Sequence, residues 1–341
     1  VEKNTRVKAR VKAHALKEFM NTKEKVVVMG HRLPDADSFG AAVGIYRAAK
    51  TLNKKAYIVI DNPTSSIIPL MNTFRDNQDY EADMFVNNHE AKEIMDDNTL
   101  LVVVDTNKPS ITQCEDLLYM AKMIVVLDHH RQGSDTIRNS VLSYIEPYAS
   151  SASEMVAEIL QYFTEGIRIR NVEADSIYAG IMIDTDNFMQ KTGVRTFEAA
   201  AFLRRCGADV TRVRKLFRED MNDYKARGET IRNAELFRGQ FAISECPSDY
   251  VDSPTVVGAQ AANELLNIVG VKASFVLTEY KGVIYISARA IDEVNVQIIM
   301  ERMGGGGHLN MAGCQLETVN MEGARSLLKS TLTEMQDGGE I

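Results

Sequence analysis

The sequence predicts a two-domain α/β protein whose first domain is built around a parallel sheet. Short, fully apolar strands alternate with helical segments in the first half of the chain, which is typical of a parallel sheet covered by helices on both faces. The chain has 341 residues, of which 45% are hydrophobic and 25% charged, so it is long enough for two domains. A second alternation of strands and helices follows a charged stretch at residues 218–238.

The elements of the first domain, residues 1–217, are predicted in chain order. An amphipathic helix over residues 5–19 carries a basic face that we interpret as solvated. A helix at residues 38–52 follows the first strand, and helices dominate from residue 151 onward. The buried strands are expected at residues 26–29, 56–60, 100–104 and 123–127.

The charged stretch at residues 218–238 is predicted to be a helical connector, followed by a smaller α/β domain over residues 239–341. Alternating apolar residues predict strands in that domain at 240–245, 273–279 and 283–289. Its helices are expected at residues 254–268, 295–302 and 321–335.

The composition excludes several classes of protein. No apolar run is long enough to span a membrane, and the charged N-terminus lacks the apolar core of a signal peptide. The four cysteines never show C-x-x-C spacing, which favours buried thiols in a reducing cytoplasm over a disulfide framework or a zinc ribbon. The net charge of −8 argues against a general nucleic-acid surface. The chain begins with Val1 instead of Met, which suggests a piece of a longer protein.

Acidic and imidazole side chains cluster where the predicted strands end, which is the edge at which open α/β sheets bind ligands. A single Asp after a strand is usually a helix cap, but carboxylates held close together repel unless a cation neutralises them. Oxygen and nitrogen donors without thiolates favour Mn²⁺, with Mg²⁺ and Zn²⁺ open, and there are more candidates than one tetrahedral ion needs. We therefore expect two ions, and the six candidate ligands are His31, Asp35, Asp37, Asp105, His129 and Asp184.

The second domain offers features suited to an anion. Four consecutive glycines, Gly304 to Gly307, precede His308, and backbone N–H groups without a Cβ nearby can approach a phosphate closely. The alternative is a flexible surface loop. Arg289 lies at a predicted strand end, where its guanidinium can form paired hydrogen bonds with phosphate oxygens or simply join a surface ion pair.

These segments together resemble the DHH phosphoesterase superfamily with its DHH-associated C-terminal domain, and the resemblance covers nearly the whole chain. The segments that carry it are residues 28–31, 35–37, 105, 128–131 and 304–313. Within the superfamily the chain is most similar to the catalytic region of GdpP-type cyclic di-AMP phosphodiesterases. That likeness implies an active site in the cleft between the domains, and a soluble fragment on the cytoplasmic face of a membrane-anchored bacterial parent protein.

The resemblance also implies roles for individual residues. His31, Asp35 and Asp105 would bind one Mn²⁺, and Asp105 would bridge to a second Mn²⁺ held also by Asp37, His129 and Asp184. Asp105 and His130, which would lie beside the reacting phosphate, are the expected catalytic residues, with Asp128 orienting its neighbours. The residues expected to bind the substrate are Arg131, Asn187, Arg289, Gly305, Gly306, Gly307 and His308.

The function implied is metal-assisted hydrolysis of cyclic di-AMP, a bacterial second messenger, to linear 5′-pApA. A nano-RNase or pAp phosphatase of the same superfamily is the alternative, because its chemistry would be nearly identical. An inactive nucleotide-binding sensor is a third possibility, which the complete set of candidate ligands disfavours. The expected partners are a cyclic or short linear dinucleotide and a second copy of the chain in a homodimer, without DNA and without membrane contact by this part of the chain.

Overall fold

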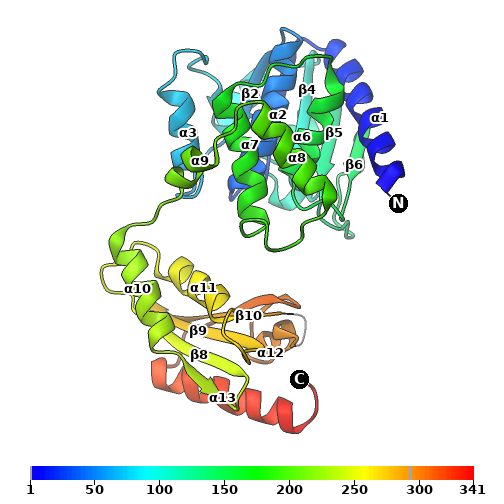
Figure 1. Cartoon of the computed structure of the whole chain (residues 1–341). Helices are drawn as coiled ribbons and strands as arrows, with labels where there is room; N and C mark the ends of the chain where they lie inside the picture. Colours follow the sequence, from blue (N-terminus) through cyan, green and yellow to red (C-terminus); the bar gives the residue numbers. More distant parts are fainter. Residues whose placement is uncertain (1, 292–293) are drawn as a thin grey trace. The chain divides into compact units, whose positions relative to one another are not determined.

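The structure, a computed structural model, describes residues 2–291 and 294–341. It divides into two compact units, the first ending at Arg218 and the second beginning at Glu219 (Figure 1). Both are α/β, as predicted. In the described part of the chain, no helix is both long enough and apolar enough to cross a bilayer.

The first unit contains a six-stranded sheet with the order β3-β2-β1-β4-β5-β6, and all neighbouring strands are parallel. The predicted parallel sheet is therefore confirmed. Its central strands are fully apolar because helices cover both of their faces. The strands are β1 (Lys25–Met29), β2 (Lys55–Val59), β3 (Phe85–Val86), β4 (Thr99–Val104), β5 (Met123–Asp128) and β6 (Leu142–Ile145).

Two hydrophobic clusters sandwich this sheet. The smaller cluster packs α4 (Asn88–Ile94) and α5 (Asp116–Met120) on one face. The larger cluster joins the other face to the remaining helices, of which α2, α6 and α7 form the central group in Figure 1. These helices are α1 (Glu2–Asn21), α2 (Ala36–Thr51), α3 (Ile68–Arg75), α6 (Ala152–Phe163), α7 (Asn171–Asp184), α8 (Val194–Arg205) and α9 (Val210–Leu216).

Glycines allow α2, α6 and α7 to pack unusually closely. A Cβ atom on Gly40 of α2 would lie 2.5 Å from the carbonyl oxygen of Ser176 on α7. A Cβ atom on Gly180 of α7 would lie 2.1 Å from the Oγ of Ser153 on α6. Any side chain at these positions would force the helices apart, so the sequence sets the spacing of three helices that begin or end at the functional edge of the sheet.

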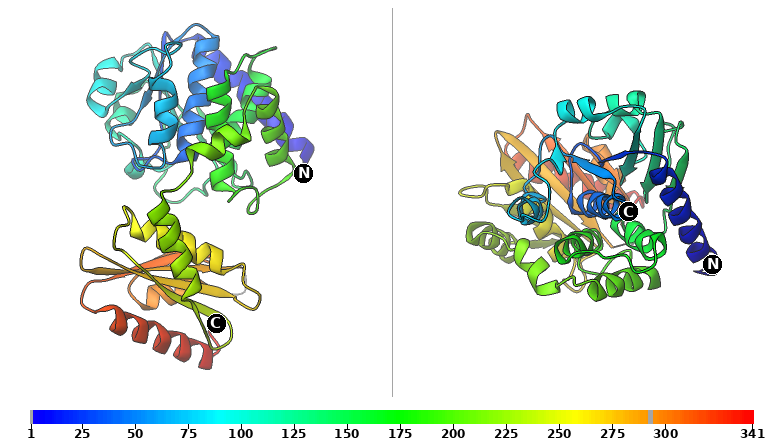
Figure 2. Two further views of the ribbon diagram at one scale, coloured as in Figure 1. Left: turned by 60° about the vertical axis from the view of Figure 1, so that its left-hand side comes forward. Right: turned by 90° about the horizontal axis from the view of Figure 1, so that it is seen from above.

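The second unit is a six-stranded sheet of order β11-β12-β10-β9-β8-β7, with helices on both faces (Figure 2). Only the β8–β9 pair is parallel. The strands are β7 (Glu235–Phe237), β8 (Phe241–Cys246), β9 (Ala273–Tyr280), β10 (Val283–Ala290), β11 (Gly306–His308) and β12 (Met311–Leu316). The helices are α10 (Met221–Arg232), α11 (Pro254–Leu265), α12 (Val296–Arg302) and α13 (Met321–Asp337).

Two parts of this unit differ from the sequence-based expectation. Residues 218–238 were expected to form a separate connector, but they contain α10 and β7, which pack within the second unit. A flexible surface loop was the alternative interpretation of the glycine segment, whereas Gly306, Gly307 and His308 form β11 and pair with β12. Glycine-rich strands carry little apolar patterning, which is why neither strand of this hairpin was predicted.

Candidate metal centre

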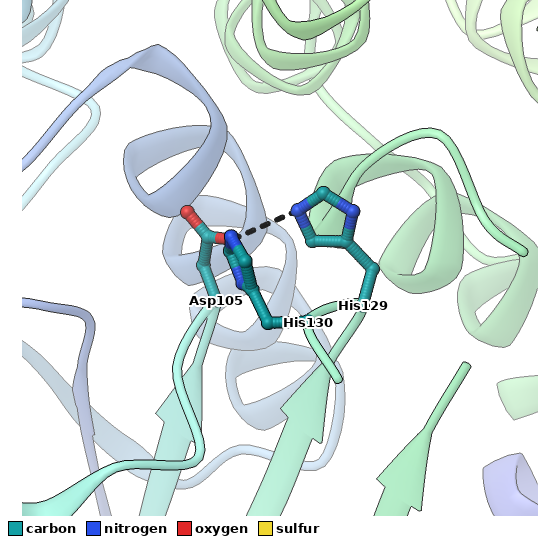
Figure 3. A group of neighbouring side chains, drawn as sticks. All are labelled: Asp105, His129 and His130. Atoms are coloured by element: carbon teal, nitrogen blue, oxygen red, sulfur yellow. Dashed lines mark ion pairs between the residues drawn. The ribbon is translucent and has the colours of Figure 1, made fainter. Parts of the chain in front are cut away.

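The predicted ligands come from strand ends that the sheet topology places side by side. His31 follows β1, Asp105 follows β4, and His129 follows β5, and these three strands are neighbours in the order β1-β4-β5. The chain reverses its winding direction between β1 and β4, which is where sheets of this order bind ligands. Figure 3 shows the His129 ring facing the Asp105 carboxylate across that edge.

One cluster consists of His31, Asp35 and Asp105, whose potential ligand atoms lie within 4.8 Å of one another. The Nε2 atom of His31 is 3.3 Å from Oδ2 of Asp105 and 3.5 Å from Oδ2 of Asp35. The other oxygen of Asp35 caps α2 by accepting a hydrogen bond from the Ser38 backbone N–H (2.9 Å). Asp35 is therefore both a helix cap and a potential ligand, with one oxygen committed to each role.

The second cluster consists of Asp37, His129 and Asp184. The Nε2 atom of His129 lies 3.7 Å from Asp37 Oδ2, 3.8 Å from Asp184 Oδ2 and 3.3 Å from Asp105 Oδ1. Asp105 thus turns one carboxylate oxygen toward each cluster. The structure brings all six predicted ligands together in these two groups, and Asp105 also forms a third group of potential ligands with His129 and His130.

The N-terminus of α6 holds Asp37 in place. The backbone N–H groups of Ala152 and Ser153 each donate a hydrogen bond of 2.7 Å to the Asp37 carboxylate, and the Ser153 hydroxyl donates to the Asp37 carbonyl oxygen (3.0 Å). The positive end of the helix dipole favours the carboxylate anion there. Sequence reasoning identified the start of α6 but not this contact, because the partners are 115 residues apart and share no local pattern.

Burial and mutual repulsion of the carboxylates shift the pKa values of both the acidic residues and the histidines in these two clusters. Burial raises the pKa of Asp37, which is 1% exposed, and the nearby charges of Asp105 and Asp184 raise it further. Burial also raises the pKa of Asp184. Burial by itself would lower the pKa of the two histidines, but hydrogen bonds and charges from the surrounding carboxylates raise the pKa of His31 to about 10 and that of His129 to about 9.

The residues present fit divalent metal ions. The Oδ1 atom of Asp105 is buried and has no hydrogen-bond partner among the described residues, although this atom faces the ligand atoms of His129. A buried carboxylate oxygen without a partner costs free energy, and a bound cation removes that cost. Carboxylate oxygens and imidazole nitrogens are donors suited to Mn²⁺, Mg²⁺ or Zn²⁺.

The buried carboxylate of Asp128 orients the His130 ring. Its Nδ1 atom is 2.8 Å from Oδ1 of the fully buried Asp128, which also accepts the His130 backbone N–H (3.1 Å). The side-chain amide of Asn107 donates to the other Asp128 oxygen (2.5 Å) and to the His130 carbonyl oxygen (3.3 Å). Asn107 is a buried positioning residue that sequence reasoning missed, since an Asn after a strand has no distinctive spacing.

The predicted substrate-binding residues fall into two places. Arg131 and Asn187 are exposed in the first unit, and neither side chain makes a hydrogen bond or ion pair with another described residue. In the second unit, Arg289 is half-buried on β10, His308 is exposed on β11, and the glycines precede or form β11. Asn187 has a φ of 57°, in a loop where Asp186 and Phe188 are also left-handed.

Comparison with known proteins agrees with this geometry. Residues 25–181 match the DHH family, N-terminal domain, and residues 241–334 match the DHHA1 domain. The chain belongs to the DHH family. This DHH-family chain is 43% identical over 345 residues to the cyclic-di-AMP phosphodiesterase GdpP of Bacillus subtilis, across 99% of its own length and 52% of that protein. It therefore spans about half the length of this relative.

More distant DHH-family members are also similar. The bifunctional oligoribonuclease and PAP phosphatase NrnA of Thermus thermophilus is 24% identical over 324 residues, covering 93% of this chain and 92% of that protein. A crystal structure of an exopolyphosphatase-related protein from Bacteroides fragilis has a TM-score of 0.79 at 20% identity, covering 96% and 97% of the two chains. RecJ of Thermus thermophilus in complex with Mn²⁺ has a TM-score of 0.53 at 13% identity, covering 96% of this chain and 55% of RecJ. These two structures confirm the fold.

Proposed function

We propose that this chain hydrolyses cyclic di-AMP to linear 5′-pApA with the help of two divalent metal ions. The observation that carries the proposal is the pair of carboxylate–imidazole clusters joined by Asp105 at the switch point of the sheet. The similarity to the Bacillus subtilis phosphodiesterase over nearly the whole chain supports the choice of substrate.

Manganese is the proposed ion in both positions. His31, Asp35 and Asp105 would hold one ion, and Asp37, Asp105, His129 and Asp184 the other. The RecJ structure that shares the fold contains Mn²⁺, which supports this choice alongside the donor types. The chemistry supplied by two such ions is the activation of a water molecule and the withdrawal of charge from the reacting phosphate.

His130 is the proposed proton donor to the leaving 3′-oxygen. With Nδ1 directed at Asp128, its Nε2 atom is left for the substrate, and the side chain is 56% exposed. The buried carboxylate of Asp128 fixes the orientation of the His130 ring. Arg131 and Asn187, whose side chains are uncommitted within the described structure, are proposed to contact the substrate on the same side.

Parallel assays test the substrate. The purified chain with Mn²⁺ is given cyclic di-AMP, pApA and pAp at equal concentrations, and products are separated by chromatography. We expect cyclic di-AMP to be consumed fastest and 5′-pApA to accumulate. Faster turnover of pApA or pAp would instead favour the second candidate, an oligoribonuclease and pAp phosphatase, which the similarity to NrnA supports. Binding of all three without turnover would indicate a sensor.

The assembly and location of the whole protein are also proposals. A homodimer and a membrane-anchored parent with this part at the cytoplasmic face were expected from the family resemblance. The relative of Bacillus subtilis is about twice as long as the matched region, which leaves room for further domains in a protein of that type. Light scattering coupled to gel filtration tests the dimer directly, because a mass near 38 kDa would exclude it.

A further inference from the structure

A buried carboxylate, that of Glu154, lies in the first turn of α6 and belongs to neither ligand cluster. Glu154 is 2% exposed and makes no ion pair with another described residue, since the nearby Arg195 pairs with Glu158 instead. Its Oε2 atom accepts hydrogen bonds from the Ser150 backbone N–H (3.2 Å), the Ser150 hydroxyl and the Thr196 hydroxyl (2.6 Å). An apolar side chain would be less costly at this position if Glu154 served packing alone.

The Glu154 side chain does not close the cap of its own helix. Ser151 caps α6, and its hydroxyl accepts the Glu154 backbone N–H (3.0 Å). In a capping box the Glu side chain would accept the Ser151 backbone N–H in return. Here it accepts from Ser150, one residue earlier, and from Thr196 on α8. The carboxylate therefore fixes the loop that enters α6 and joins that loop to α8.

On the α6 side, this link leads to Asp37. Ser150 lies directly before the turn in which the backbone N–H groups of Ala152 and Ser153 donate to the Asp37 carboxylate. These two N–H groups can both reach Asp37 only while the first turn of α6 keeps its position. Because the bonds from Ser150 to Glu154 span that turn, Glu154 supports Asp37 through the start of α6.

On the α8 side, the link leads to Asp184. The Thr196 hydroxyl, which donates to Glu154, accepts the backbone N–H of Gly193 (3.0 Å). Gly193 ends the loop that follows Asp184, and residues 186–188 of this loop have φ values of 47°, 57° and 66°. Three consecutive left-handed residues without a glycine are unfavourable and persist only where the surrounding structure holds them. The hydrogen bonds from Gly193 through Thr196 to Glu154 hold the far end of this loop.

We propose that Glu154 is a positioning residue for the second cluster, placing Asp37 through Ser150 and Asp184 through Thr196. The inference rests on the proposed function, which assigns a metal ion to these ligands, and it names the group that sets their spacing. Neither connection leads to His31 or Asp35. Loss of Glu154 should therefore weaken the ion of the second cluster and spare the ion of the other cluster.

Titration of the full chain with Mn²⁺, followed by calorimetry, tests this role. The wild type should bind two ions. Glu154→Ala and Thr196→Val should each weaken one ion about 10–100-fold, as expected for loss of a group that orients metal ligands, and leave the other ion unchanged. Asp184→Asn identifies the weakened ion, because it should lose the same one. Glu154→Gln keeps an acceptor oxygen and Thr196→Ser keeps the hydroxyl, so both should bind like the wild type.

Hydrogen–deuterium exchange in EDTA measures the same positioning without metal or catalysis. Peptides that contain Ala152 and Ser153 should exchange faster in Glu154→Ala and Thr196→Val, because their N–H groups no longer stay on Asp37. Thr51→Val is the matched control, since the Thr51 hydroxyl donates only to the Arg47 carbonyl oxygen within α2. It should change neither the exchange of these peptides nor the affinity for either ion.

Unchanged Mn²⁺ binding in both Glu154→Ala and Thr196→Val, or equal losses of both ions, would overturn the positioning role. Thr196→Val keeps the shape of the side chain, so it decides the question if Glu154→Ala does not fold. If the wild type hydrolyses cyclic di-AMP while both variants bind Mn²⁺ normally, only the positioning role is wrong. If the variants behave as expected but the wild type does not hydrolyse cyclic di-AMP, only the proposed reaction is wrong.

Discussion

Asp105 carries more of the proposed chemistry than any other single residue, because both ligand clusters depend on it. It has a φ of 59°, a left-handed conformation that Asp and Asn adopt more readily than most residues. Asp105→Asn therefore keeps a compatible backbone and removes only the charge, whereas Asp105→Ala also strains the turn. We expect Asp105→Asn to fold, to lose Mn²⁺ from both positions, and to lose about 10³-fold or more in kcat/KM.

Titration calorimetry and a hydrolysis assay on the same Asp105→Asn sample check this prediction. Wild-type metal stoichiometry with full activity would contradict the shared role of Asp105. Stability measured by urea unfolding in EDTA controls for folding, and it should be at least that of the wild type, because the variant removes one buried negative charge from a crowded group.

The Asp128–His130 pair predicts a defect in catalysis without a defect in metal binding. Asp128→Asn replaces the acceptor that orients Nδ1 of His130 and leaves all six metal ligands in place. We expect kcat to fall about 10²–10⁴-fold while Mn²⁺ affinity changes little. Steady-state kinetics with metal titration on one preparation separates the two effects. A parallel loss of Mn²⁺ would show that Asp128 acts mainly on the neighbouring ligand His129.

The raised pKa values of His31 and His129 predict that metal binding releases protons. Without metal these rings titrate at about 10 and about 9, so both are protonated at pH 7 and must lose a proton to become ligands. Mn²⁺ affinity should therefore increase from pH 6.5 to pH 8.5, by up to about tenfold per pH unit for each proton released. Calorimetry in two buffers of different ionisation enthalpy counts the protons. Affinity that is independent of pH would contradict protonated histidines in the metal-free site.

At the scale of elements, the close packing of α2, α6 and α7 sets the geometry of the second cluster. Gly180→Ala would place a Cβ atom 2.1 Å from Ser153 Oγ, the atom that donates to the Asp37 carbonyl oxygen. We expect a loss of about 1–3 kcal/mol in the free energy of unfolding and weaker Mn²⁺ binding, measured by urea titration and calorimetry.

Gly133→Ala is the matched control for that prediction. Its Cβ atom would meet nothing within 4 Å and its φ is not left-handed, so the expected change in unfolding free energy is within about 0.5 kcal/mol. Gly180→Ala that is as stable as this control and binds Mn²⁺ normally would contradict the prediction. The helices could then separate without disturbing Asp37, so the close packing of α6 and α7 would not be what positions Asp37.

Some helices and strands could be predicted from the sequence and others could not. The strands β1, β4 and β5 were predictable because they are continuous apolar runs, and the ligands that follow them share one sheet edge whatever the strand order. The hydrogen bonds from α6 to Asp37 were not predictable, since they join helices distant in the chain. The β11–β12 hairpin was not predicted, because the glycines of β11 show no alternation of apolar and polar residues.

For the whole molecule, two separate cores predict two unfolding transitions, of which only one should respond to metal. The hydrophobic clusters of the two units share no residues, and all six candidate metal ligands lie in the first unit. Mn²⁺ at about 100 times its Kd should stabilise the first unit by about 2.7 kcal/mol for each ion bound, and each ion should raise Tm by about 5–10 °C for a domain of that size.

Differential scanning calorimetry with Mn²⁺ and with EDTA measures both transitions. Gly180→Ala should lower the same transition that EDTA lowers, which assigns it to the first unit, and Asp105→Asn should abolish its response to Mn²⁺. The second transition should stay fixed in every case, because all six candidate metal ligands lie in the first unit. A metal-dependent shift of both transitions would contradict independent unfolding. It would mean that the two units unfold together and that bound metal stabilises the whole chain.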